Sequence, residues 1–126
     1  MNLTPSSIGQ IAITVADVRK ALHFYRDILG LRFLFEAGQN LAFLQVGEVR
    51  IMLSTPQGAG KIGANSILYF NVYDIEAVHA QLVTQGAANE RGPQLAARMP
   101  DHDLWLAFLR DPDGNIVGLM EEKKSL

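Results

Sequence analysis

Apolar and polar residues alternate over residues 8–15, which predicts a strand with one apolar face and one more polar face. An apolar stripe at helical spacing follows over residues 18–29. It lies between Asp17, which suits a helix N-cap, and Gly30, which suits a left-handed helix end. Three short strand-like runs come next, at 31–35, 41–46 and 49–54. The first half of the chain is therefore predicted to run strand, helix, strand, strand, strand.

The same order of elements returns in the second half of the chain. A strand is predicted at 67–72, a helix from Asp74 to Gly86, a weak strand near 94–98, and strands at 103–110 and 115–120. The capping aspartates are 57 residues apart (74 minus 17) and the terminal glycines 56 (86 minus 30), which indicates an internal duplication. We predict one domain, 1–126, made of module one (about 8–54), a glycine-rich linker (55–65) and module two (about 66–121).

Composition narrows the class of protein. A chain of 126 residues that is 48% hydrophobic and 19% charged is typical of a folded globular domain. The net charge of -2 and the scattered Lys61, Arg91 and Arg98 argue against nucleic-acid binding. No apolar run approaches the ~20 residues that cross a bilayer, so no membrane association is expected. The absence of cysteine excludes disulfides and thiolate sites, and the N-terminus lacks a secretory pattern, which favours a cytoplasmic location.

Two motifs resemble a known family. Residues 11–31 read I-x-I-x-V-x-D-V-x-K-A-x-x-F-Y-R-D-I-L-G-L, similar to the opening of modules in the glyoxalase/bleomycin-resistance/dioxygenase superfamily (vicinal oxygen chelate fold). Residues 108–115, FLRDPDGN, resemble the turn before the last strand of these modules. The resemblance covers nearly the whole chain. It implies an α+β fold in which two tandem βαβββ modules form a curled mixed sheet, or cup, and it implies a homodimer.

In metal-using members of this family, four strand residues hold the ion. The resemblance places these ligands at Gln10, Met52, Ile67 and Gly118. Only Gln10 offers an oxygen, whereas such ions need several nitrogen or oxygen donors. We therefore expect neither a metal site nor another cofactor. The alternative is a divalent metal held by an unusual set such as Gln10, His102 and Glu122.

Residues of the same strand parity as the family's ligands would line the cup. They are mostly apolar with a few hydrogen-bonding groups, which is typical of a pocket for a small organic molecule. The alternative is that these side chains fill the cup as an ordinary core. Trp105 is added because its ring can stack on an aromatic ligand, although its strand parity is open and it also suits a core or a dimer interface. The predicted ligand-binding residues are Gln10, Thr14, Met52, Ile67, Tyr69, Asn71, Trp105 and Met120.

His102 is the candidate catalytic residue. It lies just before a predicted strand, between Asp101 and Asp103, whose carboxylates favour the imidazolium form. It could transfer a proton at the mouth of a pocket. The alternative is a surface histidine that shares charge with its neighbours.

Three functions remain in competition. The first is a metal-independent small-molecule-binding protein of the bleomycin-resistance type, which sequesters a small apolar or aromatic compound. The second is an enzyme with an atypical site: a lyase or isomerase similar to lactoylglutathione lyase, or an extradiol-type dioxygenase. The third is an interaction module whose cup is filled by its own side chains.

Overall fold

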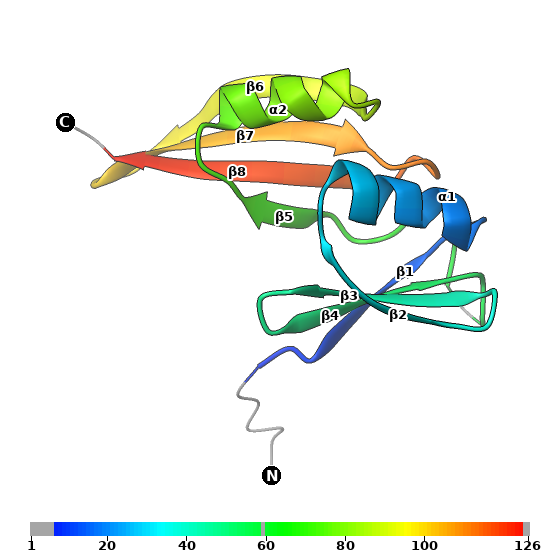
Figure 1. The fold of residues 1–126 in the computed structure, drawn as a ribbon. Coiled ribbons are helices and arrows are strands. Elements are labelled where there is room, and N and C mark those ends of the chain that lie inside the picture. Colours follow the sequence, from blue (N-terminus) through cyan, green and yellow to red (C-terminus); the bar gives the residue numbers. More distant parts are fainter. Residues whose placement is uncertain (1–6, 59, 125–126) are drawn as a thin grey trace, which may run out of the picture. The chain divides into compact units, whose positions relative to one another are not determined.

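The computed structural model describes residues 7–58 and 60–124. The chain divides into two compact units, Met1–Ile62 and Gly63–Leu126, and the boundary lies inside the predicted linker. Each unit contains one helical segment and one four-stranded sheet (Figure 1). Both sheets mix parallel and antiparallel strand pairs, which confirms the predicted α+β fold of two βαβββ modules.

The first unit has its strands in the order β1-β4-β3-β2, with β1 and β4 parallel. One face of this sheet packs against the helical segment. Ile13, Leu44 and Leu53 are buried on that face, together with Leu22 and Tyr25 of the helical segment. The alternation predicted for these strands is therefore present. The elements are β1 (Gln10–Thr14), α1 (Val18–Leu22), η1 (His23–Ile28), β2 (Arg32–Ala37), β3 (Leu41–Val46) and β4 (Val49–Ser54).

The first helix differs from the sequence prediction in its second half. Asp17 caps it as predicted, accepting hydrogen bonds from the N–H groups of Arg19 (2.8 Å) and Lys20 (3.2 Å). From His23 the helix widens into the π-helical turn η1, where the Leu29 N–H reaches back five residues to the Phe24 carbonyl oxygen at 2.8 Å. The apolar stripe does not reveal this widening, because its spacing over residues 18–29 fits 3.6 residues per turn throughout. Gly30 then ends the segment at φ +80°, as predicted.

The second unit has the strand order β5-β8-β7-β6, with β5 and β8 parallel. Two strands are longer than predicted. Three register shifts interrupt the pairing of β6 with β7. The first half of β6 therefore lacks the regular alternation of apolar and polar residues by which a strand is predicted. The last residues of β8 are charged and carry no apolar signal. No helix in residues 7–58 and 60–124 is long and apolar enough to cross a membrane. The elements are β5 (Leu68–Asn71), α2 (Ile75–Thr84), β6 (Ala88–Arg98), β7 (His102–Arg110) and β8 (Ile116–Lys124).

Two carboxylates hold the start of α2. Asp74 is the N-cap, as predicted, and its side chain accepts from the Ala77 N–H at 3.4 Å. Its own backbone is left-handed, with φ +58°, a conformation that aspartate tolerates better than most residues. Glu121 of β8 accepts from the N–H groups of Asp74 (3.1 Å) and Ile75 (2.9 Å). A negative charge at a helix N-terminus is stabilising, so Glu121 fixes α2 to its sheet.

The pairing of α2 with β8 predicts a pH effect. Lys123 donates to both oxygens of Glu76, at 2.7 and 3.0 Å. This hydrogen bond lowers the pKa of Glu76 below its usual range. The stabilisation by Glu76 is therefore complete above the ordinary glutamate pKa and is lost as the pH falls through the lowered folded-state value. We expect Glu76→Gln to be slightly less stable than the wild type at neutral pH and equal to it in acid, by urea titration at both pH values. A difference that persists in acid would contradict this role for the Glu76 charge.

Candidate ligand-binding site

One face of the second sheet carries no helix. Tyr69 and Phe108 both flank Gly118 in the strand register, and Asn71 and Leu106 both flank Met120. These side chains, with Glu122, form what we call the open face. The opposite face holds the buried core beside α2, which includes Ala107, Leu109, Val117 and Leu119. The open face is therefore an accessible surface of mixed apolar and hydrogen-bonding character.

Tyr69 lies across the position of Gly118. A Cβ at Gly118 would come within 2.7 Å of the Tyr69 ring, so only glycine leaves room for this ring position. Tyr69 also meets Phe108 edge to face, with ring centroids 5.8 Å apart. Despite these contacts the Tyr69 residue is 47% exposed. The two rings thus form an aromatic wall that remains accessible to a ligand.

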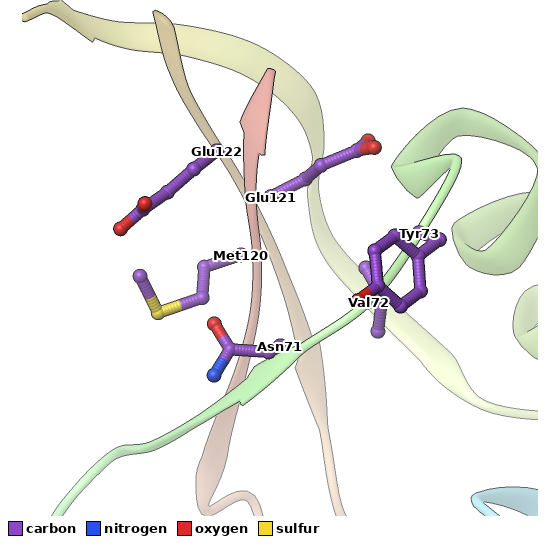
Figure 2. A pocket seen from close by; sticks show the side chains of 6 residues that line it. All are labelled: Asn71, Val72, Tyr73, Met120, Glu121 and Glu122. Carbon is purple, nitrogen blue, oxygen red and sulfur yellow. The ribbon is translucent and has the colours of Figure 1, made fainter. Parts of the chain in front are cut away.

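A hollow of about 400 Å³ lies where β5 ends. Figure 2 shows that Asn71, Met120 and Glu122 point to the same side of the strands, whereas Glu121 points toward α2. The lining residues are Asn71, Val72, Tyr73, Met120, Glu121 and Glu122. β5 stops at Asn71 while β8 continues to Lys124, which leaves this space beside the strand. The amide, the thioether and the carboxylate offer hydrogen-bonding groups next to an adaptable apolar one.

His102 begins β7 at one end of the open face. Its Nδ1 lies 2.8 Å from Asp101 Oδ1, and its Nε2 lies 3.9 Å from Glu122 Oε1. The hydrogen bond with His102 lowers the pKa of the Asp101 carboxyl. Asp103, the other predicted neighbour, instead pairs with Arg98 at 3.4 Å. His102 therefore lies between Asp101 and Glu122, and its catalytic role stays a prediction.

A second hollow on the open face has a volume of about 250 Å³. We call it the Arg91 hollow. Two of its residues, Ile67 and Tyr69, belong to the predicted ligand-binding set. The others come from β6, β7 and the start of β8. The lining residues are Ile67, Tyr69, Glu90, Arg91, Phe108 and Ile116.

The first unit has a corresponding uncovered sheet face. Gln10 and Met52 lie together on it, with the Gln10 amide nitrogen 3.8 Å from the Met52 sulfur. The Gln10 amide oxygen accepts a 2.6 Å hydrogen bond from Nε of Arg50. Thr14 lies on the same face but is half-buried, because the backbone at Gly60 lies against it. The contact is so close that a Cβ at Gly60 would collide with the Thr14 hydroxyl. Gln10 and Met52 are thus brought together as predicted, while the loop at Gly60 partly covers Thr14.

Trp105 is the one predicted ligand residue of the second unit that lies apart from the others. Its register partner is Glu121, so it projects from the face opposite to Phe108 and Leu106. The Lys123 ammonium lies over its ring, 4.6 Å from the centroid. The structure therefore does not bring Trp105 together with Tyr69, Asn71 and Met120.

The family's four metal positions do not fit a divalent cation. The single oxygen among them, on Gln10, is already held by the Arg50 guanidinium, whose positive charge opposes a cation. The space beside Gly118 is taken by the Tyr69 ring. Met52 and Ile67 provide no hard donor. Among the described residues, no three His, Asp or Glu side chains come together in a way that could hold an ion.

Sequence reasoning missed Arg91, Phe108 and, as a ligand contact, Glu122. Glu122 carries a readable signal, because it lies two residues from the predicted face residue Met120 on the regular strand β8. Phe108 carries none, because no motif in the sequence marks which face β7 presents. Arg91 carries none, because the register of β6 shifts on both sides of it.

Two helix-backed sheets in tandem and the motifs at Asp17 and Asp111 define a class of protein. The chain belongs to the Glyoxalase/Bleomycin resistance protein/Dioxygenase superfamily, whose family model matches residues 7–119. This confirms the resemblance inferred from the two motifs.

Individual proteins are similar to this chain over most of their length, two in structure and one in sequence. TnmS3, an antibiotic binding protein from Streptomyces sp. CB03234, superposes with a TM-score of 0.79 at 22% identity, covering 97% of this chain and 100% of that one. A lactoylglutathione lyase from Agrobacterium tumefaciens superposes with a TM-score of 0.75 at 24% identity, covering 93% and 94%. The Bacillus subtilis (strain 168) protein YraH, described as uncharacterized, is 27% identical over 124 residues, covering 86% of this chain and 92% of YraH. A shared fold does not determine a shared ligand or reaction.

Proposed function

We propose that this protein binds a small, planar, partly apolar molecule without a metal ion and without chemical turnover. The observation that carries the proposal is the open face of the second unit, where an exposed aromatic wall lines one hollow and another hollow lies where β5 ends. A folded domain rarely exposes a contiguous apolar surface of this kind unless a ligand or a partner binds there.

The chemistry of the lining supports a ligand of this class. Tyr69 and Phe108 present ring surfaces for stacking, and Met120 offers an adaptable apolar contact. Asn71 adds hydrogen-bonding groups that can orient the ligand. Small-molecule sites are usually built in this way, from mostly apolar walls with a few polar groups.

Two further points favour binding over metal-assisted catalysis. The family's metal positions hold one amide oxygen, already bound by Arg50, and no other hard donor. In addition, a protein of the same fold, TnmS3, is an antibiotic binding protein. The lyase or dioxygenase alternative would need a donor set that these positions do not supply.

Calorimetric titration of chelator-treated protein tests the proposal, with neutral one- and two-ring aromatic compounds such as naphthylmethanol. We expect saturable binding that is unaffected by added nickel, zinc, manganese or ferrous iron, and no change in the compound after incubation. Tyr69→Ala should weaken binding about fivefold or more, because it removes half of the aromatic wall.

Phe33→Ala is the matched control for Tyr69→Ala. Phe33 is a partly exposed aromatic residue, and its register partner Leu44 is buried on the helix side of the first sheet. This variant should bind like the wild type. Binding that appears only with a metal ion, or conversion of the compound, would contradict the proposed binding function and favour an enzyme. The homodimer and the cytoplasmic location stay predictions from the sequence.

A further inference from the structure

The Arg91 hollow contains a guanidinium that lies against an aromatic ring. The Arg91 guanidinium carbon lies 5.1 Å from the centroid of the Phe108 ring. In the part of the chain that the structure describes, Arg91 forms no ion pair with any carboxylate. Its side chain is exposed, so a molecule in the hollow can reach it.

An irregularity in β6 places this guanidinium on the open face. Asn89 pairs with Leu109 and Arg91 pairs with Phe108, so two steps along β6 correspond to one step along β7. A β-bulge of this kind turns a side chain that regular alternation would direct elsewhere. Arg91 therefore shares the face of Phe108 and Tyr69 instead of the buried face of Leu109.

The neighbouring carboxylate is already paired with another residue. Glu90 accepts a 2.8 Å hydrogen bond from Nε of Arg110, which also donates to the Gly114 carbonyl oxygen at 2.7 Å. The hydrogen bond from Arg110 lowers the pKa of Glu90, and the charge of Arg91 acts in the same direction. Glu90 is thus ionised at neutral pH. One carboxylate and two guanidiniums leave a net charge of about +1 at this end of the open face.

The hollow therefore combines an apolar wall with a cation at its rim. Ile67 and Ile116 contribute aliphatic surface, and Tyr69 and Phe108 contribute rings. A volume of about 250 Å³ is small beside the roughly 300–1,000 Å³ of drug-sized sites, which suits a part of one or two rings. A guanidinium recognises a carboxylate through paired, charge-assisted hydrogen bonds.

We propose that the ligand of this site is an aromatic carboxylate, whose ring lies against Tyr69 and Phe108 and whose carboxylate pairs with Arg91. This inference rests on the proposed function and adds the charge of the ligand to it.

Three probes that share one naphthalene ring test the proposal on chelator-treated protein: naphthoate, an anion; naphthylmethanol, neutral; and naphthylmethylammonium, a cation. By calorimetry, naphthoate should bind about tenfold more tightly than naphthylmethanol, the size of one hydrogen bond to a charged group, and the cation should bind most weakly. The preference for the anion should shrink as salt is added, because Arg91 is exposed.

Arg91→Gln should reduce naphthoate binding to the level of naphthylmethanol and leave naphthylmethanol binding unchanged. Arg98→Gln is the matched control: it removes the same charge from the same strand, at a residue outside the hollow that is paired with Asp103. It should bind all three probes like the wild type. Equal binding of naphthoate and naphthylmethanol, or equal losses in the two variants, would contradict the proposal that the ligand is an anion. Either result would be compatible with the proposed small-molecule-binding function. Failure of all three probes to bind would count against the proposed function itself.

Discussion

Leu109→Ala is expected to lower the free energy of unfolding of the second unit by about 3 kcal/mol. Leu109 is fully buried on the helix-covered face of β7, where Ala107 and Val117 are also buried. Truncation removes buried methyl groups and leaves a cavity that the neighbouring strands fill only in part. Urea unfolding followed by the fluorescence of Trp105, the only tryptophan of the chain, measures the loss directly in this unit.

Leu95→Ala is the control for this prediction. Leu95 lies on β6 of the same sheet, but it is 38% exposed, so its truncation should cost about 1 kcal/mol or less. Equal losses in the two variants would contradict burial of the Leu109 side chain as the source of the loss.

Asp111→Ala is expected to be about as damaging, at about 3 kcal/mol. The Asp111 carboxylate is buried and accepts hydrogen bonds from the Asp113 N–H (2.9 Å), the Asn115 N–H (2.8 Å) and the Asn115 side-chain amide (2.8 Å). Asn115 in turn accepts from the side-chain amide of Asn65 at 2.9 Å. Removing the carboxylate leaves these donors without an acceptor and loosens the turn that leads into β8.

The same urea titration checks this prediction, with two comparison variants. Asp103→Ala removes a carboxylate that has one ion pair at 3.4 Å, so it should cost about 0.5 kcal/mol or less. Asp111→Asn keeps one acceptor oxygen and should fall between the two alanine variants. If Asp111→Ala costs no more than Asp103→Ala, the DPDG turn does not hold β8 in place.

The Leu109 prediction and the two binding predictions concern opposite faces of one sheet. The helix-covered face sustains the fold through fully buried aliphatic residues such as Leu109. The open face keeps Tyr69 and Phe108 accessible, and these side chains add less to the stability of the unit. Variants on the open face should therefore change binding with little change in stability, which makes the tests of Tyr69 and Arg91 interpretable.

Much of the site was predictable wherever a strand is regular. Side chains alternate strictly along β1, β4, β5 and β8, so the positions implied by the resemblance, extended by strand parity, placed Gln10 with Met52 and Asn71 with Met120. The same counting could not place Trp105, because no motif marked which face β7 presents. Its position opposite to Phe108 follows only from the register of β7 with β8.

By itself, the sequence determined the order of the elements, the duplication and the family. These depend on short-range signals: a capping aspartate, a left-handed glycine and the period of apolar residues, all read within one turn or one strand. The tertiary structure alone decided how distant segments meet. It placed Tyr69 over Gly118, Glu121 at the start of α2, and Arg91 on the open face through a bulge in β6. Each of these depends on strand register, which is set by pairing between segments far apart in the chain.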